Sequence, residues 1–295
     1  GFVKITPNPY PAAFLAKPNS VTSTNDVNGQ SFMAQVRFKP EGPVTVDYTF
    51  DYSRNRQKPD FAQLYSVLGN NPASFNDLWT DPAILAAIAP LGLYASKTRQ
   101  STGSVNASPL YEYSRSMGHA LTVSLDLGSA TLKSITSYRK LKWEDSLDLD
   151  GSPLDVAFTQ RLTDFHAFSQ ELQASGSALD DKLKYVLGGF YYSEKAETLG
   201  PQFFFGFLNQ VSAPGAAVLQ SDYGGHTKAF ALYSQIDYKL ADPLTLTLGG
   251  RYTHEKKDIR RFFGVGAPVF PLFNLPYGGA PDATFNKFTP AVTLA

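Results

Sequence analysis

Apolar and polar side chains alternate along much of this chain. Between Val44 and Ser53, valines and aromatic residues take every second position, with Thr, Asp and Ser between them. From Leu244 to Glu255, leucines, a glycine and a tyrosine alternate in the same way with threonines, a glycine, an arginine and a glutamate. A helix would mix the two sets on every side, whereas a strand separates them onto opposite faces. The pattern therefore predicts strands with one apolar and one polar face.

The same alternation, with more interruptions, predicts nine strands in all. They cover Phe32–Phe38, Val44–Ser53, Tyr113–Leu127, Ala130–Trp143, Phe165–Gly176, Leu183–Glu194, Lys228–Leu240, Leu244–Glu255 and a last segment that starts near Phe285. Several of these run for about 13–15 residues, whereas strands of soluble proteins usually have about 5–6. At about 3.3 Å per residue and a tilt of about 40°, such a strand covers about 35 Å along a membrane normal. These strands are long enough to cross a bilayer.

Short and long connections alternate between the predicted strands. The short turns at 39–43, 127–129, 177–182 and 241–243 contain Gly, Pro or Asp, which suit tight hairpins. The long segments are Arg54–Glu112, Glu144–Asp164, Lys195–Thr227 and Asp258–Thr284. Within the first, we predict a short helix at Phe75–Leu91, capped by Asp77 or Asp81. Short turns at one end and long loops at the other are typical of an outer-membrane barrel with periplasmic turns.

Composition agrees with this plan and excludes several other classes. Lys plus Arg and Asp plus Glu both number 26, so no general positive charge favours nucleic acid. The chain has no cysteine and no run of about eighteen apolar residues, which excludes disulfides and an apolar spanning helix. Phe (22) and Tyr (16) gather near the predicted strand ends, as an interfacial aromatic girdle requires. The alternative is that they form the core of a soluble β-sandwich.

Several segments resemble the barrel of TonB-dependent receptors of the proteobacterial type. They are ATLKSITSYRKL, DLDGSP, FSQELQASGSALDDKLKYVLGGFYYSE, FALYSQIDYKLADPLTLTLGGRYTHEKKD and FTPAVTLA. The resemblance implies an antiparallel transmembrane barrel of 22 strands, preceded by a plug domain and a TonB-contact motif. The nine strands here, with no segment like a plug or that motif, lead us to expect an internal fragment. Residues 1–30 would then be a remnant of an extracellular loop, and residues 31–295 part of the barrel.

The resemblance also implies a function, location and partners. The parent protein would be an outer-membrane receptor, not an enzyme, that imports a ferric siderophore, a cobalamin-like molecule or an oligosaccharide with energy delivered through TonB. Its partners would be outer-membrane lipid, TonB, its own plug and remaining strands, and the nutrient, such as a ferric chelate. No cofactor is implied. Two other hypotheses stay open: a passive porin-type barrel and a secreted soluble β-sandwich that serves as a binding module.

Two groups of residues are candidates for binding. An aromatic run in a predicted external loop could capture a planar or apolar ligand, and its members are Phe203, Phe204, Phe205 and Phe207. Polar residues on the predicted inner face could line the lumen or contact the plug, and these are Asp47, Asp51, Arg251 and Glu255. The competing interpretation of the first group is packing among loops.

Catalytic and metal chemistry find no support in the sequence. The four histidines, His119, His166, His226 and His254, are isolated, without the close partners that metal sites often show. We predict that His119 lies on the outward face of its strand. The acidic segment EDSLDLDG lacks the spacing and final Glu of an EF-hand, so we expect solvated loop acids there. No nucleophile elbow or phosphate-binding loop is present.

Overall fold

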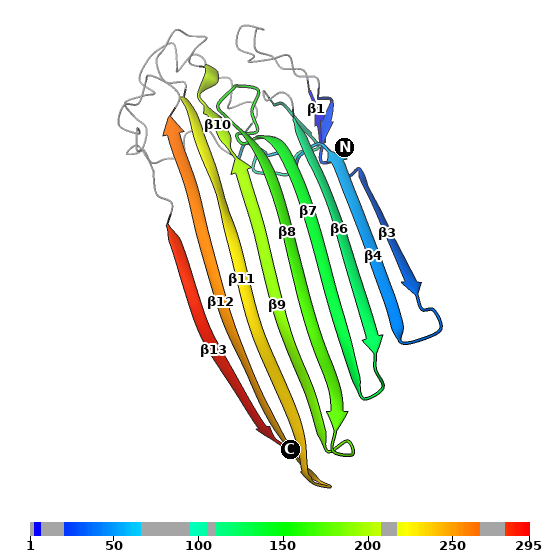
Figure 1. Cartoon of the computed structure of the whole chain (residues 1–295). Helices are drawn as coiled ribbons and strands as arrows, with labels where there is room; N and C mark the ends of the chain where they lie inside the picture. Colours follow the sequence, from blue (N-terminus) through cyan, green and yellow to red (C-terminus); the bar gives the residue numbers. More distant parts are fainter. Residues whose placement is uncertain (1–2, 7–20, 66–94, 106–109, 208–216, 266–280) are drawn as a thin grey trace.

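Long antiparallel strands form one curved sheet in the computed structural model, which describes residues 3–6, 21–65, 95–105, 110–207, 217–265 and 281–295 (Figure 1). In chain order the strands of this sheet are β3 (Gly29–Phe38), β4 (Val44–Gln57), β6 (Tyr111–Asp126), β7 (Ala130–Asp148), β8 (Ala157–Ala178), β9 (Leu183–Leu199), β10 (Pro201–Phe204), β11 (Ala217–Ala241), β12 (Leu244–Val265) and β13 (Asp282–Leu294). Each long strand pairs with the next one along the chain, and the short β10 continues past β9 between β8 and β11. The prediction of an all-β antiparallel sheet of about nine strands is confirmed.

The short turns fall where the sequence predicts them and lie together at one end of the sheet (Figure 1). Gly42 and Gly128 have φ angles of 117° and 83°, which a residue without a Cβ adopts at little cost. The turn between β8 and β9 is different, because Leu179, Asp180 and Asp181 all have positive φ angles of 53–62°. Only two residues separate β11 from β12. These tight connections fix which strands are neighbours.

The strands extend further toward the long-loop end than the alternation predicts. β12 reaches Val265, although the predicted strand ends at Glu255, and β11 starts at Ala217 instead of Lys228. Beyond the apolar zone, both faces of a strand can meet water, so charged residues occupy successive positions, as in Lys256–Asp258 and at Arg260 and Arg261. Alternation then disappears although the backbone pairing continues. The long loops predicted from the sequence therefore include residues that belong to strands in the structure.

Residues near the long-loop end pack into a small cap. Three short strands form a separate sheet there: β1 (Val3–Ile5), β2 (Ser23–Thr24) and β5 (Thr102–Gly103). Its apolar core contains Val21, Val105 and Leu110, with Ile5, Phe61 and Phe158 packed against them. We use "cap" for this sheet, its core, residues 58–65, and the loop segments 149–156 and 205–207.

One contact ties the loop between β7 and β8 to the rest of the cap. Gly151 has a φ angle of 66°, and a Cβ at this position would overlap the carbonyl oxygen of Ala62. The glycine therefore allows a close approach of two backbones. The helix predicted at Phe75–Leu91 lies outside the described residues. Within the described ranges, no helix has the length and apolar character needed to cross a membrane.

Candidate functional site

The two faces of the large sheet differ in chemistry, as the alternation predicts. Residues that pair across strands share a face, so the register assigns each side chain. On one face, Val46 lies opposite Val123, and Leu232 lies opposite Tyr252, which in turn lies opposite Phe288. Many exposed apolar side chains of the sheet lie on this face. In an outer-membrane barrel the apolar face meets lipid and the polar face meets the lumen, and we call them the outward and the lumen face.

His119 lies on the outward face, as predicted. Its Nδ1 atom is 2.8 Å from the hydroxyl oxygen of Tyr48, and its ring centroid is 5.0 Å from that of Phe50. We call the large sheet the wall. His119 packs among the aromatic residues of its outward face. Among the described residues, no group of three or more His, Asp or Glu side chains is arranged to hold a metal ion.

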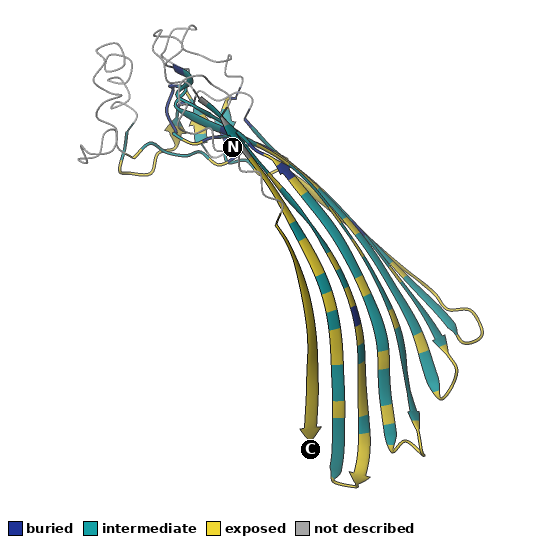
Figure 2. Ribbon diagram, turned by 60° about the vertical axis from the view of Figure 1, so that its left-hand side comes forward, coloured by how far each residue is buried: buried dark blue, intermediate teal, exposed yellow. Residues whose placement is uncertain are grey.

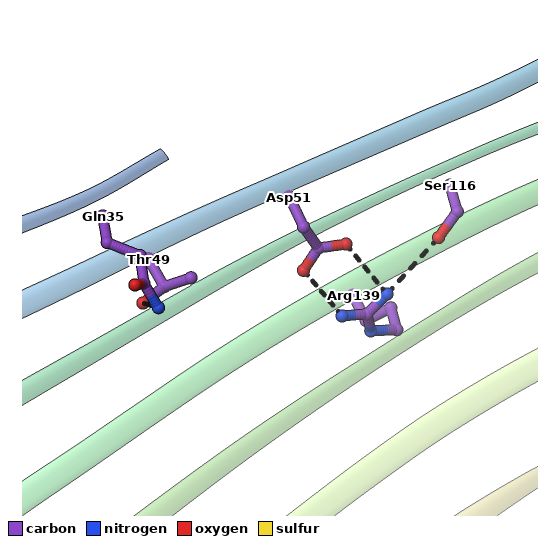
Figure 3. Close-up of polar contacts among 5 residues, drawn as sticks. All are labelled: Gln35, Thr49, Asp51, Ser116 and Arg139. Atoms are coloured by element: carbon purple, nitrogen blue, oxygen red, sulfur yellow. Dashed lines mark hydrogen bonds and ion pairs between the residues drawn. The ribbon is translucent and has the colours of Figure 1, made fainter. Parts of the chain in front are cut away.

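The most organised polar contact of the lumen face joins three strands (Figure 3). Arg139 of β7 donates two hydrogen bonds to the carboxylate of Asp51 on β4, at 2.8 and 3.1 Å, and one of 3.4 Å to Ser116 of β6. The pair crosses β6 at Gly118, which lies directly opposite both residues. A Cβ on Gly118 would overlap both side chains, so the glycine provides the space for this bridge.

A second bridge repeats this arrangement further along the lumen face. Tyr233 of β11 lies across Gly188 of β9 and reaches β8, where its hydroxyl group donates to Glu171 and accepts a 3.2 Å hydrogen bond from Gln173. Each bridge joins two strands that are separated by a third, and both leave side-chain polar atoms on the lumen side. The glycines could have been noticed in the sequence as small residues inside predicted strands. Their partners could not, because they depend on the register.

The four predicted lumen residues share one face, but the structure does not bring them together. Asp47 forms an ion pair of 2.6 Å with Arg37 on the neighbouring strand, and Asp51 pairs with Arg139. Arg251 lies 5.9 Å from the ring centroid of Phe190 and donates a hydrogen bond of 3.2 Å to Thr253. Glu255 is 3.0 Å from Lys257. They are distributed over the wall, and contact with a plug stays a prediction for all four.

The predicted aromatic run lies at the long-loop end, as expected, and its members differ in environment. Phe203 and Phe204 belong to β10, and Phe203 stacks on Phe158 with ring centroids 5.2 Å apart. Phe205 has a φ angle of 56°, and its backbone N–H donates to Val156 at 2.7 Å. Phe207 has no exposed surface. The first three keep part of their surface accessible, and a role in ligand capture stays a prediction.

Acidic residues between β7 and β8 organise the loop backbone. One carboxylate oxygen of Asp148 accepts hydrogen bonds from the N–H groups of Asp150 and Gly151, at 3.0 and 2.8 Å. Asp150 accepts in turn from Ser152 and, at 2.9 Å, from the N–H of Ala157. Burial raises the pKa of Asp150 to about 6, although the hydrogen bonds that Asp150 accepts from Ser152 and Ala157 oppose the shift. Asp145 and Asp148 are buried, so the expectation of solvated acids was wrong for these two.

Comparisons with known proteins agree with the geometry of the wall. Residues 37–295 match the family model described as TonB dependent receptor-like, beta-barrel, so the chain belongs to the TonB-dependent receptor family, whose barrels sit in the outer membrane. The ferric yersiniabactin uptake receptor FyuA from Yersinia pestis has a similar structure, with a TM-score of 0.65 and 11% identity over 100% of this chain and 37% of the receptor.

Two further solved structures share this fold. The ferric citrate transporter FecA in its unliganded form gives a TM-score of 0.55 and 11% identity over 92% of this chain and 34% of its own length. The ferric-catecholate import receptor Fiu from K12 E. coli gives 0.52 and 10%, over 92% of this chain and 41% of its own length. The chain therefore spans 34–41% of the length of these receptors.

The family answers several of the questions that the sequence leaves open. The predicted class, an outer-membrane receptor barrel, is confirmed, and the prediction that the chain is not an enzyme is confirmed by its membership of a family of transporters. The soluble β-sandwich is excluded. Identities of 10–11% establish the fold alone.

Proposed function

We propose that the longer protein to which this wall belongs imports a ferric chelate across the outer membrane, with energy delivered through TonB. The observation that carries the proposal is the polar lumen face with its bridges at Gly118 and Gly188, on a barrel of the TonB-dependent family. A wall built this way offers hydrogen-bonding groups to a plug domain and to a polar solute. The solved structures with a similar wall are named as receptors or transporters for ferric yersiniabactin, ferric citrate and ferric catecholates, which supports iron chelates as the first class to test.

Asp51, Arg251 and their neighbours would act mainly on the plug. Asp51 and Arg139 satisfy each other but remain 37% and 51% exposed, so both can accept further partners on the lumen side. Glu255 and Asp47 are likewise paired within the wall and accessible from the lumen. The nutrient itself would first meet the external loops, where Phe203, Phe204 and Phe205 offer aromatic surface.

Uptake in living cells tests the proposal. Cells that express the full-length receptor under iron limitation are given iron-loaded citrate, catecholate and hydroxamate chelates, with vitamin B12 and a maltooligosaccharide in parallel. We expect saturable iron uptake that stops when TonB is deleted or when a protonophore dissipates the proton gradient. Uptake that is independent of both would identify a passive porin-type pathway, and uptake of only the cobalamin or sugar would refute the iron assignment.

A variant of the lumen wall links the assay to the structure. Gly118→Ala should displace the Asp51–Arg139 pair and lower uptake, while the amount of receptor at the cell surface stays the same. Lys256→Gln, which removes one cation from the outward face of β12, is the matched control and should leave uptake unchanged. Equal uptake by the two variants would show that the bridge has no role in transport.

A further inference from the structure

Basic residues form a belt at one border of the apolar zone on the outward face. The belt crosses six neighbouring strands, from β4 to β11. On each of them, the apolar residues of the outward face end toward the long loops at a basic side chain. His119 is not counted, because it lies among the aromatic residues of the apolar zone. The belt consists of Arg54, Arg115, Lys140, His166, Lys195 and Lys228. On β7, β8 and β9, acidic residues come only further out, at Glu144, Asp164 and Glu197. The border itself is therefore positive.

Over β7 to β12, several cations at the belt and just beyond it are paired with acidic residues of the chain itself. A groove of about 860 Å³ on the outward face is lined there by Lys142, Lys195, His226 and Arg260, together with acidic and apolar residues. Lys142 lies 3.3 Å from Asp164, Lys195 lies 2.8 Å from Glu197, and Asp258 lies within 4 Å of both His226 and Arg260. These cations have internal partners, so this part of the wall has no evident need for an external anion.

Over β4 to β7 the positive charges are not balanced. Arg54 lies directly opposite Arg115, so two cations face each other on neighbouring strands, whereas Lys142, the next residue in this row, is already paired with Asp164. Lys140 is two residues from Lys142 on the same face. Arg54 donates a hydrogen bond of 3.3 Å to the neutral Gln30, and within the described part of the chain neither Arg115 nor Lys140 forms an ion pair. Like charges that face each other on neighbouring strands destabilise a sheet.

We propose that the cluster formed by Arg54, Arg115 and Lys140 binds a phosphate-bearing lipid headgroup of the outer leaflet. Arg54, Arg115 and Lys140 follow directly on Tyr52, Met117 and Tyr138, which end the apolar zone. A headgroup phosphate of a lipid beside the wall lies at this level, and guanidinium groups bind phosphate through paired hydrogen bonds. The bound anion removes the repulsion within this cluster, and the acyl chains cover the apolar side chains between it and the short turns. The site is on the lipid side of the wall, so it does not depend on which nutrient is transported.

The test compares phosphorylated lipid A with its enzymatically dephosphorylated form. The full-length receptor is purified in detergent, stripped of lipid and titrated with each lipid, and bound lipid is counted by native mass spectrometry. We expect the wild type to prefer the phosphorylated form. The triple variant Arg54→Gln, Arg115→Gln, Lys140→Gln should bind it about 100-fold more weakly, at roughly fivefold per cation. Lys133→Gln, Lys184→Gln, Lys287→Gln removes three cations from the lumen face and should bind like the wild type.

Three results would overturn the proposal. The wild type could bind both lipid forms equally, the two triple variants could lose binding to the same extent, or millimolar inorganic phosphate could displace the lipid completely. The last result would identify a site for free phosphate. If the triple variant does not fold, the melting temperature of the wild type in nanodiscs decides: it should be higher with phosphorylated than with dephosphorylated lipid A, and equal values would refute the site.

Discussion

Side chains of the cap are buried by other parts of the chain, whereas those of the strand wall are not. Leu154 and Phe207 have no exposed surface, while Leu172 and Leu232 on the outward face remain 60% and 54% exposed. Figure 2 shows most of the buried positions near the long-loop end, and intermediate and exposed positions along the strands. Both regions are rich in apolar residues, but the cap contains its own core. The wall obtains its burial from lipid on one face and, in a complete receptor, from other strands at β3 and β13. The comparison shows that the same amino acids stabilise the two regions through different surroundings.

Ion pairs next to the cap and ion pairs near the short turns differ in the same way. In the strand extensions below the cap, Arg161 donates two hydrogen bonds to Asp145, whose side chain is only 2% exposed. In the wall, Arg37 and Asp47 form a similar pair with 70% and 36% of their side chains exposed. Solvent screens an exposed pair, so its contribution is small, whereas a buried carboxylate that loses its partner is costly. The two ion pairs have similar geometry, but we expect them to contribute differently to the free energy of unfolding.

The largest expected effect comes from placing a charge in the lipid-facing surface. Leu248→Arg should destabilise the full-length receptor by about 3 kcal/mol, because an arginine on the lipid face of a barrel is penalised near the bilayer centre. Thr247→Arg, on the lumen face of the same strand and next to Asp237, should cost much less. The measurement is equilibrium urea unfolding in lipid vesicles, followed by electrophoretic mobility of unheated samples. Similar destabilisation by both variants would refute the assignment of faces.

A smaller effect is expected when the buried carboxylate loses its partner. Arg161→Gln should cost about 2 kcal/mol, less than for a fully buried pair because Arg161 is 46% exposed. Arg37→Gln removes the corresponding arginine from the exposed pair and should leave unfolding unchanged within error. Both variants are compared by urea unfolding in the same vesicles. An equal loss in the two would show that exposure does not separate these pairs.

The sequence was sufficient to predict the strands of the wall, because a strand with one face in lipid and one in the lumen alternates apolar and polar residues with a period of two. Strand order, turns and faces, including those of Asp51 and Arg251, follow from alternation and loop length. Strand ends could not be predicted, because beyond the lipid both faces of a strand can be polar, as at Lys256–Asp258. The cap was also missed. Its core joins residues far apart in sequence, such as Val21 and Val105, and its strands of two or three residues carry no periodicity.

The polar bridges of the lumen face were only half predictable. Asp51 was identified as a lumen residue, but its partner Arg139 is 88 positions away in the chain. That partner follows only from the register of three strands and from the space above Gly118. For the acidic residues between β7 and β8, the sequence favoured solvated side chains. In the structure, several of them accept hydrogen bonds from backbone N–H groups of a packed loop instead. Contacts of this kind depend on tertiary structure, which one sequence does not specify locally.

The smallest expected effect concerns the response of the cap to pH. Burial raises the pKa of Asp150 to about 6, above the ordinary value of 3.8, so the folded loop binds a proton more readily than the unfolded loop. The stability of the loop should therefore increase as the pH falls from about 7 through 6, and this gain is lost as the pH rises again. The expected gain between about pH 7 and pH 5 is about 1 kcal/mol.

Hydrogen exchange of residues 149–157 in the full-length receptor, corrected for the intrinsic effect of pH, measures this stability. Asp150→Asn keeps the shape of the side chain without its charge and should remove most of the pH dependence, leaving the contribution of Asp155, whose pKa is also raised by burial. The turn at 179–182, on the other side of the membrane, serves as an internal control and should not respond in the same way. A loop that opens on acidification would contradict the prediction, because it would mean that the charged carboxylate, held by the N–H groups of Ser152 and Ala157, is the form that stabilises the cap.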